Sequence, residues 1–275
     1  MSINIEKGVY KCWVCDYSGL KLSSLVKRYG DRTHYNQWIE LDEVIDLSSF
    51  DGLFATNDQE LPSKHRRISL PVDFFSLTKK LNDVEHIKAM NYLKSRNIDY
   101  NDIVRWRIGF CRTGEYEGRV CIPSFDERGD LSYFIARSYK NQFPKYKNPP
   151  VDRNIVFNDL YVDWSEPVVI VEGVFDAIVA GNALPLLGST LSERSEVFKK
   201  IITKSPTIYM ALDSDASKKE MSIIKLLLQY DLDIYKVSTD GYDDVGSMTK
   251  QQFAKRKEEA VLINQTNYLY QCLSL

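Results

Sequence analysis

The chain has 275 residues, of which 44% are hydrophobic and 27% charged, and its formal net charge is −2. This length and composition are typical of a soluble globular protein with a sizeable core and more than one folding unit. No apolar run is long enough to span a membrane and no secretory signal pattern opens the chain, so we expect a cytoplasmic protein with no membrane partner, whose nucleic-acid binding would depend on local patches of charge.

The first segment, residues 1–30, contains Cys12-Trp-Val-Cys15. This spacing lets one tight turn aim two thiolates at a tetrahedral zinc ion, although such a site needs four ligands. Only two are evident, with His34 a further candidate, and a redox pair is the alternative. The odd number of cysteines argues against a disulfide framework. Residues 31–85 are mixed in character and are expected to be a linker with short helices.

Residues 86–165 are expected to form an α+β subdomain. Apolar residues at helical spacing predict a helix over Glu85–Asn97 and a second over Asp99–Trp106. Two further apolar runs, Arg119–Pro123 and Leu131–Ile135, flank a turn rich in Asp and Gly and predict a β-hairpin.

A basic and aromatic stretch follows the hairpin. From Arg137 to Val151 the chain carries one arginine and three lysines, interleaved with Tyr139, Phe143 and Tyr146 and without an acidic residue. Lysine and arginine meet phosphates while aromatic rings stack on bases, so the stretch predicts binding of single-stranded nucleic acid. An ordinary solvated surface is the alternative for each isolated charge.

The next part of the chain alternates between apolar runs and helical patterns. Val168–Val171 and Ile208–Leu212 have no polar alternation, which predicts parallel strands covered on both faces, and Asp233–Val237 is a third strand candidate. Helices are expected over Val174–Gly181, from a capping box at Thr190 to about Lys204, and over Ala216–Tyr230.

Carboxylates follow each of the first two strands. Glu172-Gly-Val-Phe-Asp176 follows one and Asp213-Ser-Asp215 the other. In an open α/β sheet ligands collect beyond the carboxyl ends of the strands, and extended backbone points Asp213 and Asp215 to one face. Such oxygen ligands suit a hard divalent cation, so we expect a magnesium site that handles phosphates. Asp176 is either a further site residue or a helix cap.

Three motifs in this order, Glu172-Gly-Val-Phe-Asp176, Ala211-Leu-Asp213-Ser-Asp215 and Asp243-Asp-Val-Gly-Ser-Met248, resemble the TOPRIM fold of DnaG-type primases, type IA and II topoisomerases and some nucleases. The residues upstream narrow the resemblance to the primases: Tyr92–Ile98, Ile108–Phe110, Gly118–Val120, Ile122-Pro123, Gly129, Arg137, Pro144–Pro149, Phe157 and Leu160-Tyr161. The Cys12–Gly19 segment is similar to the second knuckle of a primase zinc ribbon, especially in primases of large tailed phages, with the first cysteine pair absent.

The resemblance implies an α/β fold with a TOPRIM Rossmann-like parallel sheet over residues 166–250. A preceding α+β primase subdomain would occupy residues 86–165, a partial zinc-ribbon knuckle residues 1–30, and a C-terminal tail residues 251–275.

The resemblance also implies roles for individual residues. Glu172, Asp213 and Asp215 would be catalytic, and these three with Asp244 would hold Mg²⁺ or Mn²⁺, with Asp243 the close alternative to Asp244. Cys12 and Cys15 would contribute to a Zn²⁺ site. The groove for template and primer would be lined by Arg119, Arg137, Lys145, Lys147 and Asn148.

The activity implied is that of a DNA primase, a DNA-directed RNA polymerase that joins ribonucleoside triphosphates into short primers on single-stranded DNA during replication. The chain has no G-x-x-x-x-G-K-[ST] loop, so a replicative helicase is expected as a separate partner. The expected location is the cytoplasm of a bacterial cell, and the resemblance includes primases that phages encode. The tail is a candidate docking element for that helicase, and a helix that closes the core is the alternative. A non-catalytic recombination mediator with the same metal fold and a TOPRIM nuclease are the alternative functions.

Overall fold

The computed structural model describes residues 2–4, 9–11, 18–19, 22, 26, 29–31, 33–34, 37–38, 68–81, 83–230, 232–264 and 266–268. Cys12 and Cys15, the predicted zinc ligands, lie outside these residues. The chain divides into two compact units, one formed by Met1–Pro62 with Gln229–Asp231 and the other by Ser63–Leu228 with Leu232–Leu275.

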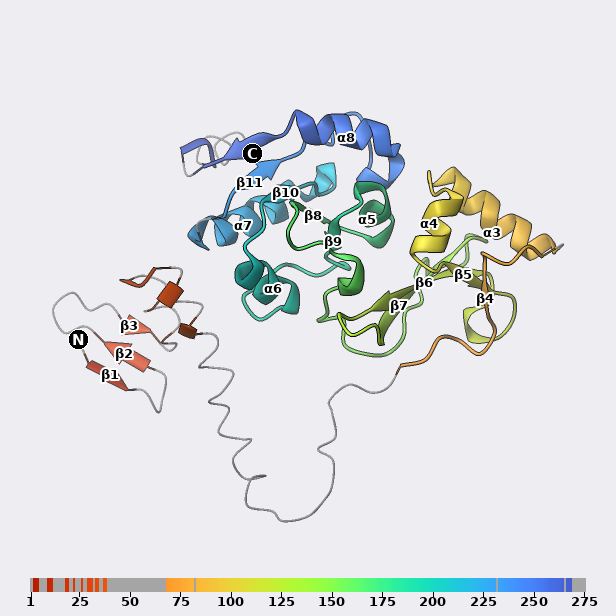
Figure 1. The fold of residues 1–275 in the computed structure, drawn as a ribbon, viewed down its shortest axis with the longest axis horizontal. Coiled ribbons are helices and arrows are strands. Elements are labelled where there is room, and N and C mark those ends of the chain that lie inside the picture. Colours follow the sequence, from red (N-terminus) through yellow and green to blue (C-terminus); the bar gives the residue numbers. More distant parts are fainter. Residues whose placement is uncertain are drawn as a thin grey trace, which may run out of the picture. The chain divides into compact units, whose positions relative to one another are not determined.

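The first unit contains an antiparallel sheet of three short strands, labelled β1 to β3 in Figure 1: β1 (Ser2–Asn4), β2 (Val9–Lys11) and β3 (Ser18–Gly19). Ser2 pairs with Lys11, and Tyr10 with Gly19. His34 is exposed, and its Nδ1 atom lies 2.8 Å from Oδ1 of Asp31. In this conformation the imidazole is therefore engaged by a neighbouring carboxylate.

The second unit begins with an antiparallel four-stranded sheet in the order β4-β5-β6-β7. Its strands are β4 (Phe74–Ser76), β5 (Gly109–Cys111), β6 (Arg119–Phe125) and β7 (Leu131–Ser138). The predicted hairpin is confirmed, because β6 and β7 pair with Ile122 opposite Ile135. The side chains of Val120 and Tyr133 are fully buried, so this sheet supplies one wall of the main core.

Two helices pack on this sheet, and both begin with a side-chain cap. In α3 (Val84–Ser95) the Asp83 carboxylate accepts a hydrogen bond from the Glu85 amide. In α4 (Tyr100–Arg105) Asp99 and Asp102 form a reciprocal capping box. Such caps satisfy amides that have no partner inside the helix, so the two helices lie close to where the sequence predicts them.

A five-stranded sheet in the order β12-β11-β10-β8-β9 follows in the chain. Its strands are β8 (Val168–Val171), β9 (Ala183–Pro185), β10 (Ile208–Met210), β11 (Ile234–Lys236) and β12 (Val261–Ile263). β10 runs parallel to both β8 and β11, and β8 runs parallel to β9, while β12 is antiparallel to β11. The expected α/β fold with a parallel sheet is confirmed, and the short strands β9 and β12 are additions to the prediction.

Helices cover both faces of this sheet: α5 (Val174–Ala180), α6 (Glu196–Lys204), α7 (Ser217–Leu227) and α8 (Lys250–Glu258). The crossover from β8 to β9 runs in the opposite direction along the sheet to the crossovers from β9 to β10 and from β10 to β11. Since parallel crossovers are right-handed, α5 lies on one face and α6 and α7 on the other (Figure 1). α8 packs against α5, and Phe253 on α8 is buried in the core. The start of the tail therefore forms a helix that closes the core, while its role as a docking element stays a prediction.

The start of α6 differs from the prediction. The expected capping box at Thr190 does not begin the helix, which starts at Glu196. The hydroxyl of Ser195 accepts from the Phe198 amide, and the amide oxygen of Asn154 accepts from the Glu196 amide. A second cap from a distant loop therefore sets the first turn of this helix.

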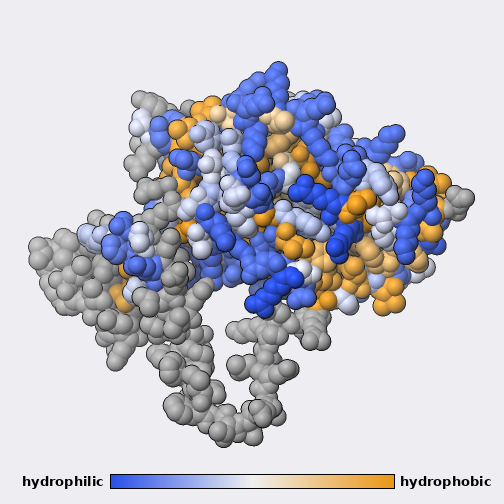
Figure 2. Space-filling view, viewed as in Figure 1, coloured by the Kyte–Doolittle hydropathy of each residue, from blue (hydrophilic) through white to orange (hydrophobic). Residues whose placement is uncertain are grey.

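Apolar and polar surface are unevenly distributed over the second unit. Exposed apolar side chains gather at the end formed by β4 and α3, where Val72, Phe75, Val84 and Ile87 reach solvent, whereas polar side chains cover α8 (Figure 2). Within the described part of the chain, no helix combines the length and the apolar character needed to cross a membrane.

Candidate active site

The parallel sheet changes direction between β8 and β10. β8 is followed by β9 on one side, whereas the chain later returns to build β10 on the other side. Ligands of open α/β sheets bind in the crevice at such a switch point, beyond the carboxyl ends of the strands. Glu172 directly follows β8 and Asp213 follows β10 within three residues, so the two predicted carboxylates flank this point.

Glu172 has one paired and one unpaired oxygen. Its Oε2 atom lies 3.2 Å from Nζ of Lys219 on α7, and both side chains are 23% exposed. Its Oε1 atom is buried and has no hydrogen-bond partner. A buried carboxylate oxygen without a partner is costly, so Oε1 is poised to accept a donor or a cation.

Asp213 lies among several other carboxylates. Burial, followed by the negative charges of Asp176, Glu172, Asp244 and Asp215, raises the pKa of Asp213 to about 7. Its Oδ1 atom is buried without a partner. Asp215 is exposed and lies in the short 3₁₀ turn Ser214–Ala216. The sequence-predicted acidic residues thus lie close enough to Asp213 for their charges to raise its pKa.

Asp244, in the loop that follows β11, adds a further carboxylate whose charge reaches Asp213. It precedes the 3₁₀ turn η6 (Val245–Ser247), and its Oδ2 atom lies 3.3 Å from Nη2 of Arg96. Its Oδ1 atom is buried without a partner. Asp243 is exposed instead, so Asp244 is the one of the two aspartates that faces Asp213.

Asp176 acts as a cap. Its Oδ2 atom accepts a hydrogen bond of 2.9 Å from the Gly173 amide, and its Oδ1 atom one of 2.7 Å from the Gly246 amide. Burial is the main cause that raises its pKa to about 6. Of the two alternatives that the sequence leaves open, the structure shows the cap, which also ties α5 to the turn that follows Asp244.

The carboxylates of this centre have the chemistry that a divalent cation needs. Among the residues that the structure describes, no group of three or more His, Cys, Asp or Glu side chains lies close enough to form a complete metal shell. Three carboxylates from three separate segments nevertheless each leave one buried oxygen without a partner: Glu172, Asp213 and Asp244. Oxygen ligands of this type suit Mg²⁺, which keeps several waters and needs few protein ligands. The residues therefore fit such an ion.

The predicted groove residues differ in their environments. Arg119 is only 4% exposed, and its guanidinium donates to the main-chain oxygens of Pro144 (2.7 Å) and Lys145 (3.2 Å). Asn148 accepts from the Ala136 amide through Oδ1. These two side chains hold the loop that follows β7 against the sheet.

The remaining three groove residues lie nearer the surface. Arg137 donates to the hydroxyl of Tyr146, and its guanidinium lies 5.0 Å from the ring centres of both Tyr146 and Phe175. Lys147 pairs with Glu115 at 3.3 Å, whereas Lys145 is exposed. Lys145 therefore offers the most accessible charge of the five.

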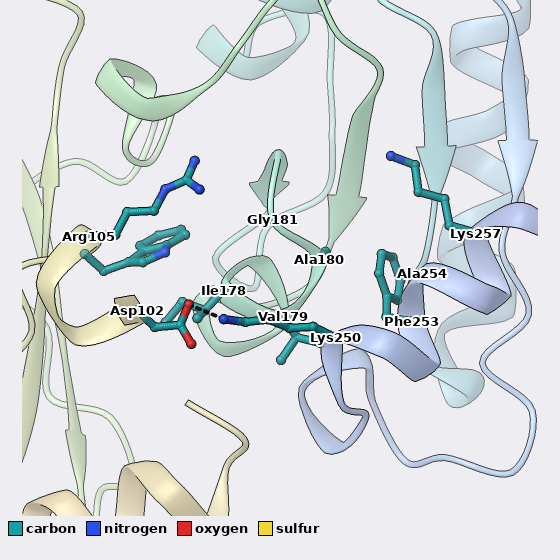
Figure 3. Close-up of a pocket in the computed structure, with 11 residues that line it drawn as sticks. Asp102, Arg105, Ile178, Val179, Ala180, Gly181, Lys250, Phe253, Ala254 and Lys257 are labelled. Carbon is teal, nitrogen blue, oxygen red and sulfur yellow. Dashed lines mark hydrogen bonds and ion pairs between the residues drawn. The ribbon is translucent and has the colours of Figure 1, made fainter. Parts of the chain in front are cut away.

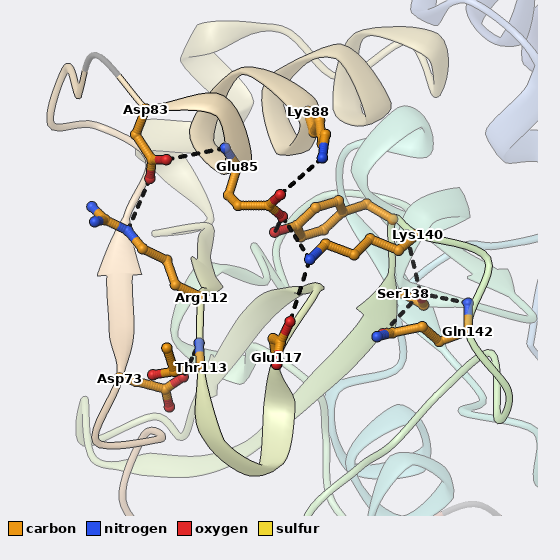
Figure 4. Close-up of polar contacts among 11 residues, drawn as sticks. Asp73, Asp83, Glu85, Lys88, Arg112, Thr113, Glu117, Ser138, Lys140 and Gln142 are labelled. Carbon is orange, nitrogen blue, oxygen red and sulfur yellow. Dashed lines mark hydrogen bonds and ion pairs between the residues drawn. The ribbon is translucent and has the colours of Figure 1, made fainter.

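Glu85 fixes the root of this loop, a role for which the sequence gives no signal. Its carboxylate accepts from the hydroxyl of Tyr139 and from the ammonium groups of Lys140 and Lys88, each at 2.9 Å (Figure 4). The hydrogen bond from Lys140 is the first cause that lowers the pKa of Glu85 to about 2. The N-terminal end of α3 and the basic loop are thereby joined by charge-assisted hydrogen bonds.

A separate cavity of about 360 Å³ lies between α4, α5 and α8 (Figure 3). Lys250 crosses its edge and pairs with Asp102 at 2.6 Å. Phe253 and Trp106 contribute apolar walls. None of the predicted site residues lines this cavity, so it is not part of the acidic centre.

Comparison with known proteins identifies relatives in sequence. The DNA primase of Thermotoga maritima is 24% identical over 184 residues, which cover 60% of this chain and 32% of the relative. The DNA primase of Aquifex aeolicus is 23% identical over an alignment of 321 positions, which covers 98% of this chain and 62% of the relative. A DNA primase of Listeria monocytogenes is 22% identical, and the match covers 76% of this chain and 42% of that relative. The chain thus spans less than two thirds of the length of these curated relatives. No family model matches the sequence.

Solved structures show a similar fold. The zinc-binding and RNA polymerase domains of the Aquifex aeolicus primase superpose with a TM-score of 0.56 at 20% identity, over 95% of this chain and 75% of that chain. A DnaG primase catalytic domain bound to single-stranded DNA gives a TM-score of 0.54 at 19% identity, over 70% and 77%. Sequence and fold together relate this chain to the DnaG-type DNA primases.

Proposed function

We propose that the chain is a DNA primase that joins ribonucleoside triphosphates into short RNA primers on a single-stranded DNA template. The observation that carries this proposal is that Glu172, Asp213 and Asp244 each hold one buried carboxylate oxygen without a partner, and that the charges of Glu172 and Asp244 reach Asp213. Phosphoryl transfer demands positioning and charge stabilisation more than covalent chemistry, and an acidic centre of this type supplies both when loaded with metal.

The residues that would hold Mg²⁺ or Mn²⁺ are Glu172, Asp213, Asp215 and Asp244. A divalent cation bound there would neutralise the phosphates of the incoming nucleotide and the charge that develops during in-line attack. Burial and the neighbouring carboxylates raise the pKa of Asp213 to about 7. Binding of a cation is therefore expected to release protons from this centre.

The template would run along the basic loop. Lys145 and Arg137 would meet its phosphates, while Lys147 lies beside the ring of Tyr116 at 5.8 Å. Arg119 and Asn148 would act from beneath by holding the loop main chain. This division of roles refines the expectation that all five line the groove directly.

We further propose that a replicative helicase works beside this chain as a separate protein in the cytoplasm of a bacterial cell. A phage genome is one proposed source of the chain. The zinc-binding domain named in the Aquifex aeolicus structure supports a Zn²⁺ role for Cys12 and Cys15. Metal analysis of the purified protein tests that role: bound zinc that is lost in Cys12→Ser supports it, and a zinc-free protein contradicts it.

The activity is tested by incubating the full chain with single-stranded DNA, Mg²⁺ and labelled ribonucleotides. Short RNA products support a primase, bare binding without products points to a mediator, and shortened DNA points to a nuclease. Asp213→Asn is expected to abolish ribonucleotide joining and to leave binding to single-stranded DNA largely intact. Asp233→Asn is the matched control, since Asp233 is exposed and precedes β11 at the opposite edge of the sheet. Equal primer yield from Asp213→Asn would contradict the proposal.

A further inference from the structure

Lys219 is the basic side chain that touches the acidic centre from α7. We infer that it is a nucleotide-binding residue, held by Glu172 in the metal-free protein and transferred to the phosphates of an incoming nucleotide once a divalent cation engages that carboxylate. The inference rests on the proposed function, because it takes the site to bind a nucleotide together with a metal ion.

The local fold places Lys219 at the centre's edge. α7 begins at Ser217, directly after the 3₁₀ turn that carries Asp215, so Lys219 lies in the first turn of the helix. Its Nζ atom lies 3.2 Å from Oε2 of Glu172. Among the described residues this is its one ion pair. The other Glu172 oxygen is buried and without a partner.

Two basic side chains balance the centre, and they differ in freedom. Arg96 pairs with Asp244, its guanidinium lies 5.6 Å from the ring centre of Phe175, and its Nε atom is buried. Lys219 is instead a compact charge on a flexible four-carbon stem. Of the two, Lys219 is the side chain that can change partner without disturbing a packed ring.

Electrostatics favours a change of partner when the site is loaded. A divalent cation at the free oxygen of Glu172 would repel the nearby ammonium group and weaken its attraction to the carboxylate. A triphosphate that arrives with the cation offers Lys219 new anionic oxygens at the same edge, and lysine is a common phosphate ligand. Lys219 thus opposes binding of the metal alone and favours binding of the nucleotide.

These two effects give Lys219→Gln opposite shifts. Removing the positive charge is expected to strengthen binding of Mn²⁺ alone, measured by electron paramagnetic resonance, by about tenfold. It is expected to weaken binding of a ribonucleoside triphosphate in saturating Mn²⁺, measured by calorimetry, by about tenfold. A residue that only supports the fold would weaken both or change neither.

Two variants provide controls. Lys218→Gln removes the same charge from the neighbouring, exposed position of α7, which has no carboxylate partner among the described ion pairs. Its affinities for Mn²⁺ and for the nucleotide are both expected to stay within about twofold of those of the unchanged protein. Lys219→Arg keeps the charge and is expected to keep nucleotide binding near that of the unchanged protein. Thermal unfolding of each variant checks that the fold is retained.

The outcomes separate this inference from the proposed function. Opposite shifts in Lys219→Gln support the inference even if primer synthesis is not detected. If the unchanged protein binds Mn²⁺ and nucleotide but Lys219→Gln leaves nucleotide affinity unaltered, the inference alone is overturned. If the unchanged protein binds neither, the proposed function fails and the inference fails with it.

Discussion

The Oδ1 atom of Asp176 accepts a hydrogen bond of 2.7 Å from the main-chain amide of Gly246, across 70 residues of sequence. Asp176 lies on α5, which follows Glu172, and Gly246 lies in the turn that follows Asp244. A Cβ atom on Gly246 would lie 2.8 Å from this oxygen, so the close approach needs glycine. The buried carboxylate of Asp176 thereby ties together the two segments that carry Glu172 and Asp244, each of which has one unpartnered oxygen.

Asp176→Asn is expected to lower the free energy of unfolding by about 1–3 kcal/mol, because the amide nitrogen cannot accept the second of two main-chain hydrogen bonds. Urea unfolding measures this change. Asp243→Asn is the control, since Asp243 is exposed on the same turn. A loss of stability as large in the control would show that charge in the region, and not the two hydrogen bonds, matters.

The metal-free protein is expected to lose stability as the pH rises from about 4 to about 7. Burial raises the pKa of Asp176 from 3.8 to about 6 and is the first cause that raises that of Asp213 to about 7. Both values lie above those of the unfolded chain, so the folded state holds more protons in this window and its advantage disappears as they leave. Urea unfolding in a chelator at several pH values measures the trend.

Two comparisons test the origin of that trend. Asp213→Asn cannot titrate at this position, so its stability is expected to fall less steeply with pH. Added Mg²⁺ is expected to restore stability at neutral pH, because a ligand that binds only the folded state stabilises it. An identical pH dependence in Asp213→Asn would contradict the assignment.

Lys145→Ala is expected to weaken binding to single-stranded DNA without changing the free energy of unfolding. Lys145 is exposed. When a protein contacts one phosphate fewer on a single strand, the slope of log K against log salt concentration becomes shallower by about 0.7. Fluorescence anisotropy of a labelled oligonucleotide across a salt series measures both the affinity and its slope. An unchanged slope with unchanged affinity would place Lys145 outside the path of the template.

Arg119→Met is expected to act through the fold. The substitution keeps much of the buried stem but removes the donors to the main-chain oxygens of Pro144 and Lys145. We expect a loss of about 1–3 kcal/mol in the free energy of unfolding, together with weaker DNA binding, because the loop loses its anchor. A variant that binds DNA less well at unchanged stability would instead indicate direct contact with the template.

The contrast between Arg119 and Lys145 shows where sequence reasoning reaches its limit. Glu172 and Asp213 could be predicted because they closely follow apolar strands, and the carboxyl ends of neighbouring parallel strands share an edge. The role of Arg119 depends on a loop that returns to it 25 residues later. A charge run predicts a basic surface, but it does not reveal which charges the return of the chain buries.

The fold has the same pattern of success and failure. β8 was predictable because four consecutive apolar residues indicate a strand buried on both faces. β9 and β12 have three residues each and follow helices, so periodicity has too few positions to indicate them. Lys219 lies outside the quoted motifs, and nothing in the Tyr92–Ile98 segment indicates that Arg96 meets Asp244, since each of these two basic residues is placed by a contact with a carboxylate distant in sequence.

The start of α6 offers a test that separates a local signal from a distant one. Asn154 accepts from the Glu196 amide through Oδ1 and donates to the Arg194 carbonyl through Nδ2. Asn154→Ala is expected to lower the free energy of unfolding by about 1 kcal/mol, the usual effect of losing a helix cap. Thr190→Ala removes the hydroxyl that the sequence pattern predicts as the helix cap. Because Thr190 is exposed and precedes the observed helix, no loss in the free energy of unfolding is expected. Urea unfolding with amide exchange at Glu196 distinguishes the two, and a larger loss in Thr190→Ala would mean that the helix begins where the sequence pattern places it.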